Sequence, residues 1–583
     1  MTQPERSLSN QPRKIFVGVA WPYASGPRHL GHAAGAYVPP DIFARYHRMA
    51  GNHVLMVSGS DMHGTPITVV ADQRGVTPRE VAEANHQNIA DSFAKLGMSY
   101  DLYTTTLTPT HYRVTQEFFL RLYEQGYLFQ ETTLAMYDPR AERFLPDRYV
   151  EGTCPHCGYT DARGDQCDNC GRTLDPTDLI NPRSKLTGAT PETRETTHFF
   201  LDLPKFSDRL QAWVDASESR WRPAVSAFVQ GWLREGLKPR AITRDIDWGV
   251  PIPLPGYEDK RIYVWFDAVI GYLSASVAWA ENRGEPDAWK AWWELDADGS
   301  PPGLAYYFIG KDNVPFHAII WPAMLMGYGG LALPYDVTAN EFLTLGGQKL
   351  SSSRSHTARL PFLPEALELF APDAVRFFLT INAPENRDTD FSWDEFQRRN
   401  NDELVATYGN AVHRLLSFVR SRFDSRVPGS TTLTSEDQTV LAQVESTFAG
   451  VASQIEQCHF RDALRVVMTL AQTLNRYLDE TAPWKSIKVN PDRAATSVWT
   501  ALQVVSSMRI LTAPFLPFSA QTLHTYLGGT GEVKDLPWAP VTLPAGQTIS
   551  PAAPLFQKLE DDTLAALLDR LDVTTVAPTG EPP

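Results

Sequence analysis

The pattern of apolar and polar positions divides the chain into a part with buried strands and a part with amphipathic helices. In the first part, apolar runs rich in β-branched and aromatic residues end at turn-forming residues, which is typical of buried strands. We expect such strands at KIFVGVAW (14–21), HVLMVSGSD (53–61), RIYVWFDAVIGY (261–272) and LAYYFIGKD (304–312). Helical patterns separate these strands, so the pattern predicts an α/β fold with a split, Rossmann-like parallel sheet.

Beyond about residue 385 the apolar residues recur at helical spacing instead. One amphipathic stripe consists of Leu404, Tyr408, Ala411, Val412, Leu415, Leu416 and Val419. We therefore predict six segments: the first half of the α/β domain (14–129), a connective insertion (130–245), the second half of the α/β domain (246–345), a loop region (346–385), an α-helical bundle (386–542), and a Pro-rich linker with a short helix and a disordered tail (543–583).

Composition and charge exclude several classes of protein. The chain has 583 residues, more than one hydrophobic core usually serves, and its 43% hydrophobic content is that of globular proteins. A net charge of −15 argues against a general polyanion-coating role, so any contact with nucleic acid has to be a local patch. No run approaches the ~20 apolar residues of a spanning helix, and the N-terminus does not resemble a signal peptide. We expect a cytoplasmic protein that does not bind membranes.

Four of the five cysteines lie in one short segment of the insertion. Cys154 and Cys157 form one C-x2-C pair, and after nine residues Cys167 and Cys170 form a second. Four thiolates in two such knuckles suit tetrahedral zinc, and because the ligand set is complete we expect one structural Zn²⁺ rather than a catalytic ion. Redox pairing of the thiols is the alternative. Cys458 stands alone in a region of helical pattern.

The stretch PYASGPRHLGH (22–32) directly follows the first expected strand. It places His29 and His32 on one side of a first helical turn, where backbone N–H groups and the helix dipole already favour a phosphate group. Gly31 leaves room for a flat ring to lie close to the backbone. Two polar histidines at the start of a helix are the alternative interpretation. Much later, the Gly-rich TLGGQ precedes KLSSS (349–353), which begins with Lys349.

An HLGH stretch at the end of the first strand, combined with KLSSS after the last strand of the same sheet, resembles the paired motifs of the class I aminoacyl-tRNA synthetases. In that family both motifs hold the triphosphate of ATP, which is bound with Mg²⁺. The resemblance assigns catalytic or ATP-binding roles to His29, Gly31, His32, Lys349 and Ser352. Lys349 would neutralise the charge that develops on the leaving pyrophosphate.

Ser352 departs from the family motif, which usually has a second lysine at this place. A hydroxyl hydrogen bond is weaker than one from an ammonium group, so we expect another cation to supply the charge. Arg354, two residues further on, is the first candidate, and Lys311 is the second.

Within this class the resemblance sharpens to the methionyl-tRNA synthetases and extends from about residue 14 to about residue 540. The matching blocks, in the family's order, are SDMHGTP, FLPDRYVEGTCPHCG, GDQCDNCG, YVWFDAVIGY, IGKDNVPFH and ETAPW. The resemblance implies a ligase that activates L-methionine with ATP and transfers it to tRNA(Met), including initiator tRNA. It also implies that 346–385 contacts the tRNA stem. No side chain need act as a nucleophile, because orientation and electrostatic stabilisation would supply the catalysis.

The same resemblance implies a methionine pocket. Asp61 matches the carboxylate that holds the substrate's α-ammonium through a charge-assisted hydrogen bond. The pocket walls match Tyr23, Trp265, Ala268, Tyr272 and His317. Aromatic rings favour contact with a soft thioether. Asp312 matches a group near the ATP ribose. The alternatives are plain sheet core for Trp265 and Tyr272, and capping for Asp312.

Three positions of this pocket depart from the common bacterial pattern. Trp21 stands where a smaller aliphatic residue is common, Val269 where proline is common, and Asn313 where isoleucine is common. We assign Trp21 and Asn313 to the methionine site as well. Methionine is the expected substrate, and these positions leave the strictness of its selection open.

The helical part carries the expected contacts to the anticodon. Asn410 and Arg414 lie four residues apart and point away from the apolar stripe, so we expect them to be exposed. Both match anticodon-reading positions of the family, and Trp484 matches the tryptophan that stacks on an anticodon base. A hydrophobic plug after a helix end is the alternative for Trp484. The local positive patch would come from Arg420, Arg422, Lys485 and Lys488.

Two other functions are considered. A sister synthetase for leucine, isoleucine or valine would carry a large separate editing insertion, whereas the insertion here is short and zinc-knuckled. A tRNA-binding protein that has lost activation is suggested by Ser352. The tRNA-binding domain that dimerises some relatives is expected to be absent after the Pro-rich linker, so we expect a monomer.

Overall fold

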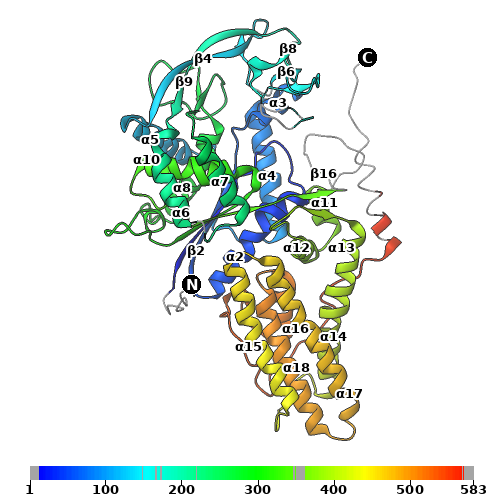
Figure 1. Ribbon diagram of the computed structural model, residues 1–583. Helices are drawn as coiled ribbons and strands as arrows, with labels where there is room; N and C mark the ends of the chain where they lie inside the picture. Colours follow the sequence, from blue (N-terminus) through cyan, green and yellow to red (C-terminus); the bar gives the residue numbers. More distant parts are fainter. Residues whose placement is uncertain are drawn as a thin grey trace.

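The computed structural model describes residues 12–146, 149–164, 167, 169–170, 174–217, 219–345, 361–562, 564–566 and 569, and the backbone of 348–349. Figure 1 shows a central α/β domain, an insertion above it in this view, and a helical bundle below it. The expected fold class, a Rossmann-like parallel sheet with an inserted cysteine cluster and a following helical bundle domain, is confirmed.

A five-stranded sheet with the order β14-β13-β1-β2-β3 forms the centre of the α/β domain, and all of its pairings are parallel. Its strands are β1 (Lys14–Val19), β2 (His53–Ser60), β3 (Leu102–Thr105), β13 (Leu304–Gly310) and β14 (Asp336–Asn340). Three of the expected strands are therefore present. The edge strands β3 and β14 are additional, and their short runs give little apolar signal.

The expected strand at RIYVWFDAVIGY is wrong. Only β12 (Arg261–Ile262) is extended there, and Val264–Asn282 forms helix α8. Periodicity alone cannot distinguish a buried helix from a buried strand, because a helix that is apolar on nearly every side shows no helical period. Length decides between them, since the 19 residues of α8 are too many for a typical strand.

Helices cover both faces of the parallel sheet (Figure 1). They are α1 (Leu30–His32), the π-helix η1 (Ala33–Tyr37), α2 (Val38–Met49), α3 (Thr65–Arg74), α4 (Pro78–Leu96), α5 (Pro109–Glu124), α8, α9 (Lys290–Trp293), the 3-10 turn η5 (Lys311–Asn313), the π-helix η6 (Phe316–Ile320) and α10 (Trp321–Tyr328).

Alternate residues of β1 enter two different cores, because side chains of a strand alternate between the faces of the sheet. Ile15 and Val17 belong to a core that also contains residues of the helical bundle. Phe16 belongs to a second core on the other face, with Phe118 of α5 and Ile270 of α8. One hydrophobic core therefore continues from the sheet into the bundle.

The insertion is an arch of two long antiparallel strands, β4 (Leu128–Asp138) and β9 (Glu192–Leu201), at the top of Figure 1. A small sheet of β6 (Val150–Thr153), β7 (Ala162–Arg163) and β8 (Ile180–Ser184) carries the cysteines. The remaining elements are β5 (Arg143–Phe144), η3 (Pro176–Asp178), η4 (Leu203–Phe206), α6 (Ser207–Ser217), α7 (Pro223–Glu235), β10 (Arg240–Ala241) and β11 (Thr243–Arg244).

A second small sheet follows β14 and contains Lys349. It consists of β15 (Leu343–Leu345), β16 (Gln348–Lys349) and β17 (Thr389–Phe391), and the backbone of Lys349 pairs with Thr344 of β15. Lys349 therefore comes after the last strand of the parallel sheet, as the sequence suggested, and lies on a hairpin strand of a separate small sheet. The sequence signal for this hairpin was the Gly-Gly pair between the short runs FLTL and QKL, since Gly-Gly is typical of a hairpin turn.

The connecting helices and the bundle complete the described fold. They are α11 (Leu363–Leu369), α12 (Pro372–Ile381), α13 (Trp393–Arg399), the π-helix η7 (Asn400–Gly409), α14 (Asn410–Arg422), α15 (Ser435–Glu456), α16 (Phe460–Thr481), α17 (Pro483–Ser486), α18 (Pro491–Thr512), α19 (Pro517–Tyr526) and η8 (Val533–Asp535). All seven residues of the predicted apolar stripe are buried, so that prediction is confirmed. In the part of the chain that the structure describes, no helix combines the length and apolarity needed to span a membrane.

A buried ion pair joins the α/β domain to the bundle. Arg376 of α12 pairs with Asp41 of α2 at 2.7 Å, and both side chains are fully buried. The same guanidinium donates hydrogen bonds to the carbonyl oxygens of Leu96, Pro514 and Phe515. A buried charge is tolerated when its partners are complete, so Arg376 fixes the bundle against the sheet.

Candidate active site and tRNA-binding end

The carboxyl ends of three adjacent strands bring the expected site residues to one edge of the sheet. β1 lies between β2 and β13, so the strand order reverses at this point, and such a reversal is where open α/β sheets bind ligands. The HLGH segment follows β1, Asp61 follows β2, and η5 follows β13. Residues far apart in the sequence therefore lie at the same edge of the sheet.

His29 and His32 lie side by side, as expected. Their ring centroids are 3.7 Å apart, and the His29 backbone N–H donates to Nδ1 of His32 at 3.3 Å. Burial, with a smaller effect of Arg28, lowers the pKa of His29 to about 3, so this ring is neutral at pH 7. Its Nδ1 is buried and has no hydrogen-bond partner among the described residues. Two rings and a helix start therefore present polar nitrogen atoms at the end of β1.

Asp61 is 2% exposed and lies directly after β2. Its Oδ1 accepts the backbone N–H of His63 at 3.0 Å, and its own backbone pairs with Tyr23. Nδ1 of His63 donates to Oδ2 of Asp267 at 2.7 Å. Burial, and then the neighbouring Asp267, raise the pKa of Asp61 well above its ordinary value. A cation that binds here would relieve this repulsion.

The expected pocket residues form two aromatic groups. The rings of Trp265 and Phe316 stack at 3.9 Å, and Tyr23 meets Trp265 edge-on at 5.8 Å. In the second group Nδ1 of His317 contacts the carbonyl oxygen of Asn313 at 2.9 Å, and a carbonyl can only accept. Nε2 of His317 is therefore the acceptor for the Tyr272 hydroxyl at 2.7 Å.

Burial lowers the pKa of His317 to about 4, so this tautomer is neutral at pH 7. Ala268 is 9% exposed and precedes Tyr272 by one helical turn on α8. Both Trp265 and Tyr272 lie on this helix rather than on a strand. Tyr272 is 1% exposed and packs in the core on this face of the sheet, where its ring meets Tyr307 of β13 at 5.0 Å.

Trp21, a departure from the common pattern, lies over two glycines. A Cβ atom at Gly59 or at Gly271 would collide with the Trp21 ring. The large indole therefore fits because β2 and α8 have glycines at these two positions. Its Nε1 is buried without a hydrogen-bond partner among the described residues. Val269 is 2% exposed and belongs to the core rather than to the aromatic groups.

The lysine loop is only partly described. Ser352 and Arg354 lie outside the described residues, and of Lys349 only the backbone is described. Lys311, the second candidate for a replacement cation, donates to Glu341 at 2.6 Å and to Asp388 at 2.9 Å. Burial would lower the pKa of Lys311, but the hydrogen bonds to these two carboxylates outweigh it and raise the pKa. Its neighbour Asp312 is exposed in η5.

The four cysteines form one cluster, and their Sγ atoms all lie within 4.8 Å of one another. The Cys154–Cys170 and Cys157–Cys167 sulfur distances are 3.9 and 3.6 Å. Sulfurs that surround a zinc ion at ~2.3 Å lie ~3.8 Å apart, whereas a disulfide needs ~2.05 Å. Hydrogen bonds, first from the Tyr159 backbone and then from Asn169, lower the pKa of the Cys157 thiol to about 6. The cluster fits a metal ion and not a pair of disulfides.

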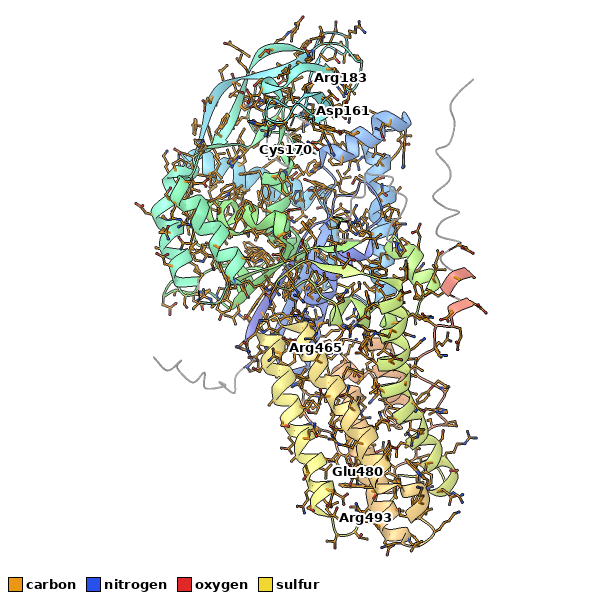
Figure 2. All side chains as sticks on the ribbon, turned by 45° about the vertical axis from the view of Figure 1, so that its right-hand side comes forward. Asp161, Cys170, Arg183, Arg465, Glu480 and Arg493 are labelled. Atoms are coloured by element: carbon orange, nitrogen blue, oxygen red, sulfur yellow. The ribbon has the colours of Figure 1, made fainter. Side chains whose placement is uncertain are left out.

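The expected anticodon contacts lie at the far end of the bundle, on α14 and at α17. Figure 2 shows Glu480 and Arg493 at that end and Cys170 at the opposite end of the molecule. Asn410 is exposed. The Arg414 guanidinium lies 4.8 Å from the centroid of the half-buried Trp484 ring and pairs with Asp479 at 3.3 Å. The surrounding cationic residues Arg420, Arg422, Lys485 and Lys488 are exposed.

Three residues of the site are not among those predicted from the sequence: His63, Asp267 and Phe316. His63 lies in the SDMHGTP block, but only Asp61 of that block was assigned a role from the sequence. Asp267 had a usable signal, because it is a carboxylate within the apolar run YVWFDAVIGY, and carboxylates are rarely buried without a role. Phe316 gave no signal beyond its aromatic ring.

Comparisons with known proteins agree with this architecture. Residues 15–416 match the family described as "tRNA synthetases class I (M)", and residues 427–575 match "Anticodon binding domain of methionyl tRNA ligase". The methionine–tRNA ligase of Roseiflexus castenholzii is 52% identical and that of Dehalococcoides mccartyi 53% identical. These alignments cover 96% and 94% of this chain, and 99% and 98% of the two relatives.

A solved structure of Mycobacterium tuberculosis methionyl-tRNA synthetase bound by methionyl-adenylate has a TM-score of 0.76 and 25% identity, and covers 94% of this chain and 100% of its own. Its apo form, at 24% identity and a TM-score of 0.70, covers 94% of this chain and 98% of its own and supports the fold alone. The split parallel sheet is that of class I aminoacyl-tRNA synthetases, which use ATP. Within that class the chain belongs to the methionine–tRNA ligase family and has methionine–tRNA ligase activity.

Proposed function

We propose that the chain performs methionine–tRNA ligation with the residues gathered at the carboxyl edge of its parallel sheet. The Asp61 carboxylate binds the α-ammonium of L-methionine in a charge-assisted hydrogen bond. The thioether side chain is held by Trp21, Tyr23, Trp265, Ala268, Tyr272, Asn313 and His317. Polarizable sulfur gains from contact with such rings, and the hydrogen bonds of His317 hold the Tyr272 hydroxyl in one orientation.

One observation carries this proposal: a buried carboxylate without a basic partner adjoins an aromatic group. Among the described residues no lysine or arginine pairs with Asp61, and its backbone pairs with that of Tyr23, whose ring meets Trp265. The test is ATP–pyrophosphate exchange with methionine, leucine, isoleucine and valine. Methionine should be activated with the highest kcat/KM. Faster exchange with any of the other three would contradict the proposed pocket.

We further propose that His29, Gly31, His32, Lys349 and Ser352 bind the triphosphate of ATP, with Asp312 near the ribose. The neutral His29 ring and the start of α1 favour phosphate oxygens. Mg²⁺ enters with ATP as part of the substrate. Lys349→Ala should slow single-turnover adenylate formation strongly, because charge on the departing pyrophosphate loses a partner.

Ser352→Ala is the matched control within the same loop and should cost much less, since a hydroxyl bond is weaker than one from an ammonium. Arg354→Ala should resemble Lys349→Ala. Lys311 is the weaker candidate for the replacement cation, since two carboxylates already share its ammonium. A Ser352→Ala defect as large as that of Lys349→Ala would show that the hydroxyl itself carries the chemistry.

At the far end of the bundle we propose that Asn410, Arg414 and Trp484 read the anticodon of tRNA(Met), including the initiator species. The half-buried indole beside the Arg414 guanidinium supports a stacking platform. Trp484→Ala should weaken tRNA charging by about 1–3 kcal/mol and leave tRNA-independent exchange intact. Equal losses in both assays would mean that Trp484 serves as core. Charging of purified initiator and elongator tRNA(Met) separates the two substrates.

We also propose that the cysteine cluster holds one structural Zn²⁺. The four thiolates would supply the complete ligand set, and the ion would stabilise a module whose own core is small. Metal analysis should find one zinc per chain, Cys154→Ser should lose it, and the buried Cys458→Ser should keep it. Protein prepared without chelator that contains no zinc would contradict the assignment.

The remaining expectations stay proposals. We take the six segments of the sequence analysis as the functional units, and the cytoplasm as the place of action, since ATP, methionine and tRNA meet there. A monomer is proposed, and a sedimentation mass near twice the 65.1 kDa of the chain would contradict it.

A further inference from the structure

A hydrogen-bonded relay connects the candidate ammonium site to the helix that carries the candidate thioether pocket. Asp267 lies in the first turn of α8, two residues after Trp265 and one before Ala268. Its Oδ2 accepts Nδ1–H of His63 at 2.7 Å, and the His63 backbone N–H donates to Oδ1 of Asp61 at 3.0 Å. The Tyr112 hydroxyl contacts the other ring nitrogen of His63 at 3.2 Å. Both ends of the imidazole are thereby fixed, and the backbone that orients Asp61 is fixed with it.

The two carboxylates of this relay are buried and have no directly bonded basic partner among the described residues. The Asp61, His63 and Asp267 side chains are buried, with residue exposures of 2%, 2% and 0%. Within the described ranges neither carboxylate pairs with lysine or arginine, and Oδ1 of Asp267 is buried without a hydrogen-bond partner. Burial raises the pKa of Asp267 well above its ordinary value, so an ionised Asp267 beside Asp61 costs stability, and a bound cation would favour the ionised form.

We propose that Asp267, acting through His63, is a positioning residue for L-methionine: it fixes the Asp61 carboxylate relative to the α8 pocket and adds a second buried negative charge that selects the substrate's α-ammonium. The proposal rests on the proposed role of Asp61. It makes the ammonium site and the thioether pocket one mechanical unit, because a single helix carries both Asp267 and the pocket residues.

A metal ion is a poorer explanation of the same cluster. His63, His111 and Asp267 have ligand atoms within 4.8 Å of one another. However, His63 already bonds Asp267 and Tyr112, and His111 already contacts Ser274 at 2.8 Å and Thr115 at 3.3 Å. A divalent ion would have to break these bonds and would repel the ammonium group.

The main test is Asp267→Asn, which keeps the shape and removes the charge. Loss of one charged interaction should raise the KM for methionine by about 10- to 100-fold. The kcat and the KM for ATP in pyrophosphate exchange should stay within about threefold, since the triphosphate site is separate. Asp373→Asn is the matched control, because it removes another buried carboxylate, which lies on α12 and accepts a hydrogen bond from Ser519 of α19. Equal changes in all three constants for Asp267→Asn would overturn the proposal.

Two inhibitors separate charge selection from general damage. L-Methioninol keeps the ammonium group and 4-(methylsulfanyl)butanoate lacks it. Asp267→Asn should weaken inhibition by methioninol only. Equal weakening of both inhibitors would mean that the helix is misplaced and would contradict the proposal.

The pH profile supplies a readout that a merely structural role would not move. The titratable and charged groups that face the relay are Asp61, His63, Arg79, His111, Tyr112, Arg261 and Asp267. Removal of the Asp267 charge removes repulsion from Asp61, so the acid limb of the methionine kcat/KM should move to lower pH. An unmoved limb would contradict the charge argument.

Two further variants keep the proposal testable if Asp267→Asn folds poorly. Tyr112→Phe removes one anchor of the His63 ring at a half-buried position and should raise the KM for methionine by about two- to fivefold. In a double-mutant cycle with His63→Ala, the effect of Asp267→Asn should become smaller, because the relay is already broken and only the direct effect of the Asp267 charge remains. Full additivity would show that Asp267 does not act through His63.

Failure of this proposal and failure of the proposed methionine site give different results. If Asp61→Asn leaves methionine binding unchanged, the role of Asp61 is wrong. If Asp61→Asn weakens binding but Asp267→Asn does not, only the positioning role is wrong.

Discussion

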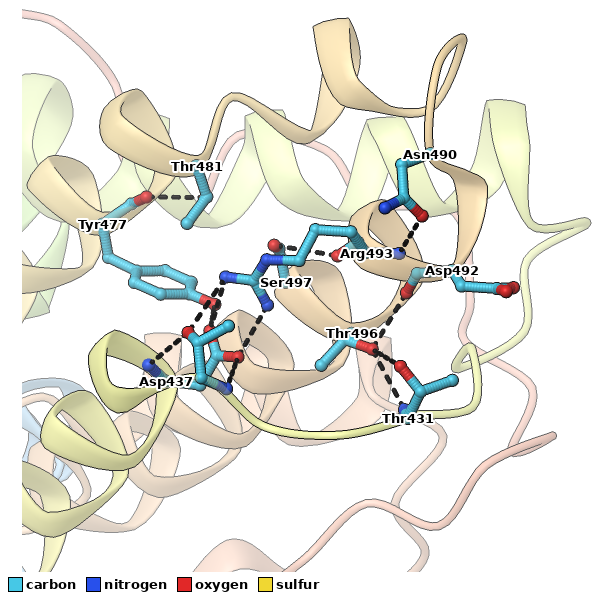
Figure 3. Close-up of polar contacts among 10 residues, drawn as sticks. Thr431, Asp437, Tyr477, Thr481, Asn490, Asp492, Arg493, Thr496 and Ser497 are labelled. Carbon is cyan, nitrogen blue, oxygen red and sulfur yellow. Dashed lines mark hydrogen bonds and ion pairs between the residues drawn. The ribbon is translucent and has the colours of Figure 1, made fainter.

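Two carboxylates, Asp61 at the sheet edge and Asp437 in the helical bundle, are both buried, yet their surroundings are opposite. Asp437 accepts hydrogen bonds from Tyr477 at 2.5 Å, from two Arg493 nitrogens at 2.6 and 2.9 Å, and from the Thr434 backbone N–H at 2.9 Å. Figure 3 shows these bonds between α15, α16 and α18. Among the described residues, the Asp61 carboxylate accepts one hydrogen bond, from the His63 backbone N–H, and it lies near a second carboxylate, Asp267.

The pKa values move in opposite directions for this reason. Burial alone would raise the pKa of Asp437, but the hydrogen bonds from Arg493 and Tyr477 outweigh it and the pKa lies below its ordinary value. At Asp61 burial and Asp267 act together and raise it. A buried carboxylate that has all of its hydrogen-bond and ion-pair partners within the protein stabilises the fold. One that lacks some of these partners is available to bind a ligand.

Of the changes that test the difference between Asp61 and Asp437, the one at the sheet edge should have the largest effect. Asp61→Asn should raise the KM for methionine by about 100-fold, because the α-ammonium loses a charge-assisted bond. The thermal midpoint should stay the same or rise, since a repelling buried charge is removed. Pyrophosphate exchange and calorimetry on the same preparation check both. A lower midpoint would mean that Asp61 is a structural residue like Asp437.

The matching change in the bundle should have the opposite result. Asp437→Asn removes charge-assisted bonds from Arg493 and should destabilise the bundle by about 1.5–3 kcal/mol, with exchange activity unchanged. Hydrogen exchange of α15 and α18 reports it locally. Asp492→Asn, an exposed change on the first turn of α18, is the control and should cost less. Loss of exchange activity in Asp437→Asn would show that the regions are not independent.

Mild acid should separate the two regions without mutation. Burial lowers the pKa of six histidines of the α/β domain: His29, His47, His63, His86, His111 and His317. The unfolded chain binds protons at these rings near pH ~6.5 and the folded one does not, so stability rises with pH and falls as the pH drops below ~6.5. Each ring contributes at most ~1.4 kcal/mol per pH unit.

The bundle should respond less over the same range. The pKa of Asp437 lies below its ordinary value, so its contribution is fully present above pH ~4 and is lost only as the pH falls through the lower, folded value. Burial also lowers the pKa of His524, a histidine on α19 in the helical part of the chain. Hydrogen exchange at pH 7 and 5.5, corrected for intrinsic rates, should show the β1 and β2 amides losing protection before those of α15 and α18. His47→Gln should reduce the difference.

The smallest effect tests an exposed ion pair of the same bundle. Arg414 and Asp479 are 37% and 65% exposed at their side chains and lie 3.3 Å apart. Exposed pairs are worth about 0–1 kcal/mol, so Asp479→Asn should leave stability nearly unchanged. It should also strengthen tRNA binding by less than about fivefold, because Arg414 loses a competitor for the nucleic acid. Filter binding with tRNA(Met) measures it, and a large stability loss would contradict the contrast between buried and exposed carboxylates.

Short motifs and spacing were sufficient for much of this molecule. The alternation of apolar runs predicted the parallel sheet and the helical bundle, and the cysteine spacing predicted a cluster that the structure closes. The pairing of His29 with His32 also followed from local spacing, because residues three apart share a side of a helical turn. These features depend on neighbours in the sequence, which is why one sequence could specify them.

The tertiary structure alone decided the rest. Helix α8 was misassigned as a strand because full burial removes the periodic signal. In the relay of Asp61, His63 and Asp267, 204 residues of sequence separate His63 from Asp267, and no local pattern indicates such a contact. A buried carboxylate can have several hydrogen-bond donors, as Asp437 has, or few, as Asp61 has. The number depends on which distant donors the fold brings within about 3 Å. The fold determines the distance between each carboxylate and its donors, whereas the sequence shows only which donor residues are present.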